Sequence, residues 1–189
     1  MSVAAETLRW SSSQRLWVPE KLSIEETLKR SGKTAIKRKK VSAPMRRLLE
    51  RDLLVGDVLD YGCGFGYDAD TLGFAAYDVN HRPKFPWSVK FNTITMIYVL
   101  NTLPSKLRRA TVRNARRLLM PGGHLYAAWR LGIVSSVLQN SNPRATPLQT
   151  NLGTLQFPYF PEYATDLVMT PEPDLSESGR WIMLHTQQP

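Results

Sequence analysis

The middle of the chain alternates between apolar runs and segments of helical period. Each run ends at a polar or acidic residue, which is typical of strands buried inside a domain. Between the runs, apolar residues recur every three or four positions, which indicates amphipathic helices that pack on a sheet. Parallel strands need such crossovers, so the pattern predicts an α/β fold with a largely parallel sheet. The predicted strands are residues 57–61, 74–78, 91–100 and 124–129, and the long helices are 42–53 and 105–120.

The two ends of the chain follow other patterns. Residues 1–22 have no clear period and predict an extended arm. Ser23 and Glu26 then form a capping-box pattern, which predicts a helix to about residue 31.

Near the C-terminus, residues 131–163 are rich in Ser, Asn, Pro and Thr and predict an irregular stretch. Its aromatic and proline residues 157–161 are interpreted either as a stacking surface for a base or, preferably, as a cover for the sheet edge. Strand-like runs at 165–170 and 180–186 predict a C-terminal antiparallel hairpin around an acidic loop.

The helix at 105–120 has two contrasting faces. Its apolar residues predict a buried face made of Leu107, Ala110, Ala115, Leu118 and Leu119. Its arginines predict a solvated face that attracts anions at long range and takes no part in catalysis; these are Arg108, Arg109, Arg113, Arg116 and Arg117.

The stretch from Asp60 to Gly66 reads Asp-Tyr-Gly-Cys-Gly-Phe-Gly and follows the first predicted strand. Glycines are needed where the backbone turns with positive φ or where a ligand touches bare main chain. The amides of such a turn, at the start of a helix, predict a site for an anionic group. Asp78 ends the next strand and is placed to accept hydrogen bonds from two ribose hydroxyls.

These motifs resemble the first two motifs of the class I S-adenosylmethionine-dependent methyltransferases. The segment Leu119 to Gly123, Leu-Met-Pro-Gly-Gly, is similar to a further segment of that family. The resemblance implies a Rossmann-like, doubly wound sheet that ends in an antiparallel pair, with S-adenosylmethionine as cofactor and methyl transfer as reaction. A narrower resemblance, to a methyltransferase group associated with DNA modification systems of the phosphorothioation type, is carried by residues 33–38, 60–68, 77–78 with Pro83, 98–101 and 153–156.

The predicted sheet is smaller than the family pattern. Only about a dozen residues separate Asp78 from the strand at 91–100, which is too few for a third strand and its crossover helix. We therefore expect a sheet trimmed around the third strand. The expected cover of the adenine is then the basic segment 33–38 together with the loop after Asp78.

The resemblance assigns the methionine end of the cofactor to Asp60 and the glycine turn, and its ribose to Asp78. The full set of predicted cofactor-binding residues is Asp60, Tyr61, Gly62, Cys63, Gly64, Gly66, Asp78, Val79 and Tyr98.

No general base is evident for the methyl acceptor, and the catalytic residues stay unknown. Asn101, Arg130 and Gln156 are candidates for the reacting end. The alternative interpretation is that Tyr98 is a packed tyrosine at the rim and that Asn101 caps a helix. The Asn/Asp-Pro-Pro-Tyr/Phe motif of amino-methylating DNA enzymes is missing at residues 101–104, and Cys63 belongs to the glycine turn, so it is not a nucleophile for cytosine.

The densest basic run, residues 33–40, precedes the glycine turn. Lys33, Thr34 and Arg38 are candidates for a lid over the substrate or cofactor, and a solvated loop is the alternative. We accordingly divide the chain into a basic N-terminal arm and lid segment, 1–41, and an S-adenosylmethionine-binding methyltransferase domain, 42–189.

The net charge is +9, and it is uneven: +7 over residues 1–52, +6 over 53–149 and −4 over 150–189. A basic region attracts polyanions, so we expect a nucleic-acid or nucleotide substrate; solubility and an acidic protein partner are the alternatives. No apolar stretch approaches the ~18–20 residues of a membrane span. A single cysteine and three scattered histidines match neither a disulfide framework nor a metal site. We expect a metal-free, cytoplasmic protein, and the oligomeric state stays open.

Three functions agree with the sequence. The first is a methyltransferase that acts on a nucleic acid or nucleotide-like acceptor, and the second is a methyltransferase of small molecules. The third is a catalytically inert protein of the same fold that serves as a nucleic-acid-binding subunit.

Overall fold

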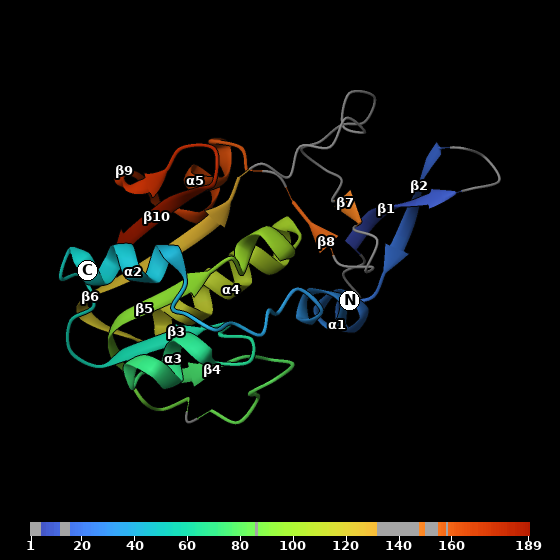
Figure 1. Cartoon of the computed structure of the whole chain (residues 1–189). Coiled ribbons are helices and arrows are strands. Elements are labelled where there is room, and N and C mark those ends of the chain that lie inside the picture. Colours follow the sequence, from blue (N-terminus) through green and yellow to red (C-terminus); the bar gives the residue numbers. More distant parts are fainter. Residues whose placement is uncertain (1–4, 12–15, 86, 132–147, 150–154, 158) are drawn as a thin grey trace.

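A six-stranded sheet with the order β4-β3-β5-β6-β10-β9 forms the centre of the computed structural model (Figure 1). The structure describes residues 5–11, 16–85, 87–131, 148–149, 155–157 and 159–189. Four neighbouring strands are parallel, and β10 and then β9 continue the sheet in antiparallel pairing. This confirms the predicted Rossmann-like fold with its C-terminal antiparallel pair. The strands are β3 (Val58–Tyr61), β4 (Ala75–Tyr77), β5 (Phe91–Ile97), β6 (Leu119–Arg130), β9 (Thr170–Glu177) and β10 (Trp181–Gln187).

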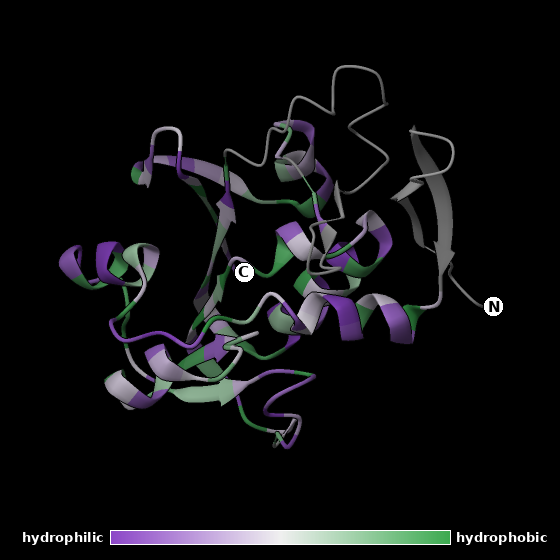
Figure 2. Cartoon of the chain, turned by 45° about the vertical axis from the view of Figure 1, so that its right-hand side comes forward, coloured by the Kyte–Doolittle hydropathy of each residue, from purple (hydrophilic) through white to green (hydrophobic). Residues whose placement is uncertain are grey.

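Helices cover both faces of the sheet because successive residues of its inner strands point to opposite sides. Leu125, Ala127 and Trp129 of β6 join the core beneath α4 and α5, whereas Tyr126 and Ala128 join a second core beneath α2. In Figure 2 the helices carry hydrophilic and hydrophobic colours on alternate stretches, as expected for helices with one buried face. The helices are α1 (Ile24–Gly32), α2 (Ala43–Glu50), α3 (Tyr67–Leu72), α4 (Ser105–Arg117) and α5 (Glu162–Leu167), with a 3₁₀ turn η1 at Leu100–Thr102.

The sheet ends at β4, and an aromatic loop lies where a third strand would follow. Between β4 and β5 the described residues form only an isolated bridge, between Asp78 and Arg82. Tyr77, Phe85 and Trp87 pack against one another with ring centroids 5.0–5.5 Å apart, and Phe85 also stacks on Phe91. The predicted trimming of the sheet is therefore confirmed, and these rings pack beside the edge that it leaves.

The N-terminal arm is more regular than its sequence predicted. β1 (Ala5–Ser11) and β2 (Leu16–Leu22) pair in antiparallel register and stand beside the main sheet (Figure 1). Hairpin pairing rests on backbone hydrogen bonds, so it needs no strict apolar period. The capping box of α1 is confirmed, since Ser23 Oγ accepts from Glu26 N at 3.1 Å and Glu26 Oε2 accepts from Ser23 N at 3.0 Å.

The C-terminal hairpin is present, but its first strand was placed too early. Residues 162–167 form α5, which ends at Val168 in a left-handed conformation (φ 54°). The acidic segment that was predicted as a loop is β9, an edge strand of the sheet. Two further strands, β7 (Leu148–Gln149) and β8 (Leu155–Gln156), pair with each other inside the predicted irregular stretch, most of which lies outside the described residues.

Candidate functional site

The glycine turn joins β3 to α3 and is conformationally demanding. Gly62 and Gly66 have φ of 84° and 85°, a region that favours glycine. A Cβ at Gly62 would overlap the Val99 side chain, and one at Gly66 would overlap the Arg82 guanidinium. Both positions thus need glycine for backbone conformation and for space.

Several amides of this turn bond to the protein itself. Gly62 N and Cys63 N donate to the Tyr77 carbonyl at 2.6 and 3.1 Å, and Gly64 N donates to Asp78 Oδ2 at 3.1 Å. The parallel neighbour β4 supplies these acceptors because it lies directly beside β3. The amides of Gly62, Cys63 and Gly64 therefore fix the shape of the turn and the position of Asp78, and these three are not free to bind an anionic group.

Asp78 is held firmly in place by main-chain donors. Besides the bond to Gly64 N, its Oδ1 accepts from Asn80 N at 2.9 Å and from His81 N at 3.0 Å. A carboxylate offers about four acceptor positions, so about one stays available to a ligand, on Oδ2.

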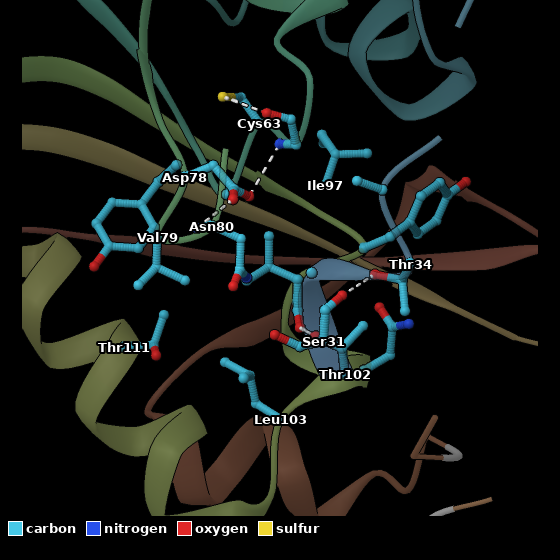
Figure 3. Close-up of a pocket in the computed structure, with 18 of the residues that line it drawn as sticks. Ser31, Thr34, Cys63, Asp78, Val79, Asn80, Ile97, Thr102, Leu103 and Thr111 are labelled. Atoms are coloured by element: carbon cyan, nitrogen blue, oxygen red, sulfur yellow. Dashed lines mark hydrogen bonds between the residues drawn. The ribbon is translucent and has the colours of Figure 1, made fainter. Parts of the chain in front are cut away.

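A cavity of about 300 Å³ lies along the ends of β4, β3, β5 and β6 (Figure 3). The predicted residues that line it are Thr34, Arg38, Asp60, Tyr61, Gly62, Cys63, Gly64, Asp78, Val79, Tyr98, Asn101, Arg130 and Gln156. Gly66 caps α3 and Lys33 caps α1, and neither lines the cavity. The Lys33 side chain is exposed at the end of α1, and its role as a lid residue stays a prediction.

Asp60 is the most perturbed acid of the cavity. It is buried at the end of β3, and Thr95 Oγ1 donates to its Oδ1 at 3.2 Å. Burial, followed by the nearby charge of Asp68, raises the pKa of Asp60 to about 7, while the Thr95 bond and the charge of Arg38 act in the opposite direction. A positive ligand group beside Asp60 would stabilise its ionised form.

The end of α1 and the following segment form one wall of the cavity. The loop after Asp78 holds this wall, since Asn80 Nδ2 donates to the Leu28 carbonyl at 3.0 Å and His81 Nε2 lies 3.1 Å from the Gly32 carbonyl. Figure 3 shows Ser31 and Thr34 facing the cavity from this side. The loop after Asp78 is thus joined to α1, directly before segment 33–38, and Arg38 of that segment lines the cavity. That these two parts cover the adenine stays a prediction.

The N-terminal half of α4 forms a wall that the sequence analysis assigned only to the core. Figure 3 places Thr111 of α4 and Leu103 near Val79, on the side of the cavity beyond Asp78. Leu107, Ala110 and Asn114 line the same cavity. The sequence signal was the row of small residues at 110, 111 and 114, which leaves space beside a helix that otherwise packs against strands.

Tyr98 lies at the end of β5 in a strained backbone conformation. Its φ is 62°, an outlier for a bulky residue, and its amide donates to the Ala128 carbonyl of β6 at 2.9 Å. Burial raises the pKa of the Tyr98 hydroxyl, and the charges of Arg38 and Arg130 oppose that shift.

Asn101 and Gln156 meet at the same end of the cavity. Asn101 Nδ2 donates to Gln156 Oε1 at 2.7 Å, and the backbone continues the link because Phe157 N donates to the Asn101 carbonyl at 2.7 Å. The carboxamide oxygen of Asn101 is buried without a protein partner. These two candidates for the reacting end are therefore brought together, and β8 is docked through them.

Arg108 is buried, which corrects its assignment to the solvated face of α4. Its guanidinium lies 4.1 Å from the ring centroid of Tyr163, 4.9 Å from that of Trp129 and 5.1 Å from that of Phe157. Burial lowers the pKa of this guanidinium, and cation–π contacts compensate part of that cost. Arg108 lies four residues before the buried Val112 and seven before the buried Ala115, so the helical period places it on the buried face. Its charge led to its assignment with the outer arginines.

Neither a reactive thiol nor a metal cluster is found in the described site. Burial raises the pKa of the Cys63 thiol to about 12, so it is protonated at neutral pH. Across the described residues, no three His, Cys, Asp or Glu side chains gather in a way that could hold a metal ion. Within the same part of the chain, every helix is too short or too polar to cross a bilayer.

A family model described as "Methyltransferase domain" matches residues 34–130, just over half of the chain. The chain belongs to this methyltransferase family. It is therefore an S-adenosylmethionine-dependent methyltransferase, as the glycine turn and Asp78 predicted. The match runs from Thr34 in the lid segment to Arg130 at the end of β6, so it spans nearly all of the cavity wall.

Solved structures share the fold of this methyltransferase at low sequence identity. DhpI in complex with S-adenosylhomocysteine has a TM-score of 0.56 and 17% identity, and the match covers 88% of this chain and 97% of that one. The glycopeptide N-methyltransferase MtfA complexed with S-adenosylhomocysteine has a TM-score of 0.52 and 15% identity, and the match covers 82% of this chain and 92% of that one. The Burkholderia thailandensis 1,6-didemethyltoxoflavin-N1-methyltransferase has a TM-score of 0.53 and 14% identity, and the match covers 77% of this chain and 76% of that one. No curated protein sequence matches the chain.

The fold alone does not specify the reaction. The [4+2]-cyclase SpnF also matches this chain, with a TM-score of 0.50, 15% identity and coverage of 77% and 79%. The acceptor must therefore be argued from the side chains of the cavity.

Proposed function

We propose that this methyltransferase transfers the methyl group of S-adenosylmethionine to a small-molecule acceptor bound inside the cavity. The observation that carries the proposal is that Asp60, Tyr98, Asn101 and Arg130 line one cavity at adjacent strand ends. The similar solved structures include enzymes named for a glycopeptide and for 1,6-didemethyltoxoflavin, which agrees with a non-polymeric acceptor.

The order of the strands supports one orientation of the cofactor. Asp78, at the end of β4, binds the ribose through the free acceptor position of Oδ2, and Asp60, one strand further, faces the methionine end. Because the amides of Gly62, Cys63 and Gly64 are occupied and Arg38 lines the same cavity, Arg38 is the charged donor for the methionine carboxylate. The remaining predicted contacts, including Tyr61, Cys63 and Gly64, are backbone and van der Waals surfaces of this site.

The adenine then lies beyond Asp78, between Val79 and the N-terminal half of α4. Val79, Leu103, Leu107 and Ala110 offer an apolar slot for a flat ring, and Thr111 and Asn114 offer polar groups at its edge. This helix replaces the residues that would follow a third strand.

S-adenosylmethionine supplies a sulfonium-bound methyl group, and in the transfer the carbon–sulfur bond breaks with its electrons kept by sulfur as the bond to the acceptor forms. The chain contributes by holding the two reactants in line, which accounts for a large part of the rate gain in such reactions. The lid segment, with Thr34 and Arg38, excludes water from that alignment. We retain 1–41 as the arm and lid and 42–189 as the catalytic domain in this proposal, and a cytoplasmic location with it.

A nucleic-acid acceptor is the second candidate, and the net charge of +9 favours it. However, Arg109, Arg113, Arg116 and Arg117 of α4 do not line the cavity, so this basic face is separate from the reacting end. A base would also have to leave its stack to reach Asn101, which is buried. The association with DNA modification systems rests on the motif resemblance alone.

Calorimetry with S-adenosylmethionine and S-adenosylhomocysteine tests the cofactor site directly. We expect binding by the wild type and at least a tenfold loss (about 1.4 kcal/mol) in Asp78→Ala. Mass spectrometry of metabolites, DNA and RNA from cells with and without the protein then identifies the acceptor by a gain of one methyl group. A methyl gain in nucleic acid only would overturn the small-molecule acceptor, and failure to bind either cofactor form would favour the inert reading.

A further inference from the structure

The cavity contains two guanidinium groups, Arg38 and Arg130, but the cofactor has only one carboxylate. Both side chains line the cavity. In the part of the chain that the structure describes, no ion pair joins either of them to a carboxylate, whereas Arg82, Arg109 and Arg180 are each paired with an acid. Asp60, Asp68 and Asp78 line the same cavity, but no ion pair to Arg38 or Arg130 is found among the described residues, so both guanidinium groups keep donors for anionic groups of the ligands.

The sheet order separates the two arginines along the cavity. The ends of β4, β3, β5 and β6 bear Asp78, Asp60, Tyr98 and Arg130 in turn, and neighbouring strands are about 4.8 Å apart. On the proposed orientation, the cofactor extends from β4 toward β5. Arg130, at the end of β6, is then one strand beyond the methionine end, on the side from which the acceptor approaches.

The acid of the neighbouring hairpin does not neutralise Arg130. Glu177 ends β9, but its Oε1 pairs with Arg180 Nη1 at 2.9 Å and its Oε2 accepts from Trp181 Nε1 at 3.1 Å. Because Leu131 N donates to the Arg180 carbonyl, the chain just after Arg130 is fixed to this same corner. Both carboxylate oxygens of Glu177 are therefore engaged by other donors, and the Arg130 guanidinium keeps its donors for a ligand.

The strained backbone of Tyr98 adds a third group to this end. A bulky residue with φ of 62° costs free energy and persists where the surroundings hold it, which is common at ligand sites. The Tyr98 hydroxyl lies within the electrostatic range of both Arg38 and Arg130. A hydroxyl donor that lines the same cavity as two guanidinium groups is suited to a carboxylate or phosphoryl oxygen.

We infer that the methyl acceptor is a small anion whose carboxylate or phosphoryl group binds Arg130 and the Tyr98 hydroxyl, while Arg38 binds the methionine carboxylate of the cofactor. The inference rests on the proposed function, because it uses the cofactor orientation given there. Arg130 is a specificity-determining residue in this view, and it takes no part in bond making.

The test compares Arg38→Met and Arg130→Met with a matched control, Arg113→Met, which removes the same charge from the exposed side of α4. Calorimetry with S-adenosylhomocysteine comes first. We expect about 10–100-fold weaker binding in Arg38→Met and less than a twofold change in the other two variants. If the wild type does not bind S-adenosylhomocysteine, the proposed function itself fails.

The second step titrates four probes into the S-adenosylhomocysteine complex: benzoate, phenyl phosphate, neutral benzamide and cationic benzylamine. We expect at least tenfold preference for one of the two anions over benzamide, lost in Arg130→Met, kept in Arg113→Met and partly restored in Arg130→Lys. Whichever anion is preferred identifies the group as carboxylate or phosphoryl.

Three results would overturn the inference while leaving cofactor binding intact. These are equal binding of benzamide and the anions, no binding of any anion, and anion binding by Arg130→Met as tight as by the wild type. A single-stranded oligonucleotide that binds more tightly than every small anion, through Arg130, would also overturn the small-molecule class.

Discussion

The two ends of the cavity are built in different ways. At the end of β4, Asp78 is held by three main-chain amides, and the glycine turn bonds to Tyr77 and Asp78 rather than to solvent. At the ends of β5 and β6, side chains form the cavity surface. They are Tyr98 in a strained conformation, the Asn101–Gln156 pair, and Arg130 without an acidic partner among the described residues. The first end is fixed largely by main-chain bonds, which suits the binding of one invariant cofactor. The second end is formed by side chains, so single substitutions can change what it binds.

The largest effect is expected at Gly62, which belongs to the cofactor end. Gly62→Val forces a β-branched residue into φ of 84° and into the space of Val99. We expect at least about 3 kcal/mol of lost stability in urea unfolding and no binding of S-adenosylhomocysteine. Gly73 offers a matched control, because it has φ of 71° but nothing within 4 Å of an added Cβ. Gly73→Val should cost only about 1–2 kcal/mol, and an equal loss in both variants would show that crowding at Val99 is unimportant.

Asp60 is expected to link stability to pH. Its pKa in the folded protein is about 7, against an ordinary value of 3.8, so the folded state binds the proton more tightly than the unfolded state. Ionisation therefore lowers stability as pH rises from about 4 to 7, and the loss is complete above pH 7. Asp60→Asn should be more stable than the wild type by about 1–4 kcal/mol at pH 8 and nearly equal at pH 4, as measured by urea unfolding. Exposed Asp57→Asn is the control, and the same pH-dependent gain there would contradict the assignment.

The protonation of Asp60 is also expected to change when the positively charged cofactor binds. Bound S-adenosylmethionine, which is positive at its methionine end, favours the ionised carboxylate, so binding at pH 7 should release a fraction of one proton. Calorimetry in buffers of different ionisation enthalpy measures this release. Its presence in Asp60→Asn would assign the proton to another group.

Substitution of Arg108 is expected to affect the two ends of the cavity differently. Arg108→Ala removes a cation enclosed by Tyr163, Trp129 and Phe157, and it leaves a space beneath the docked segment. We expect about 2 kcal/mol of lost stability and weaker acceptor binding, with S-adenosylhomocysteine affinity nearly unchanged. Arg109→Ala, on the exposed side, should stay within about 1 kcal/mol of the wild type. A similar loss in both variants would place Arg108 on the solvated face after all.

The smallest effect is expected at Gln156. Gln156→Leu removes the 2.7 Å bond from Asn101 Nδ2 and leaves the backbone link from Phe157 in place. We expect about 1 kcal/mol of lost stability and a higher KM for the acceptor, with kcat changed less than KM. A selective fall in kcat would instead place Gln156 at the reacting atoms.

The sequence carries a stronger signal for the β4 end of the cavity, where we propose that the cofactor binds, than for the β5–β6 end, and the reason is physical. Glycines at positive φ and an acid after a strand are local requirements, so the segment from Asp60 to Asp78 carries its own signal. The shortened sheet was also predictable, because a crossover needs a minimum number of residues. Arg108 was misassigned because burial of a cation depends on three aromatic rings from distant parts of the chain. The closeness of Asn101 and Gln156 depends on the docking of β8, which no periodicity encodes.

The two outer strands of the sheet bear on how the protein behaves at high concentration. An unpaired strand edge is a template for a second chain, and proteins limit this with short, charged or proline-containing edges. β4 is only three residues long, and β9 contains Pro171 and Pro173 together with Glu172, Asp174 and Glu177. Neither edge offers a continuous row of amides, so edge-to-edge aggregation is disfavoured even though no strand covers β4.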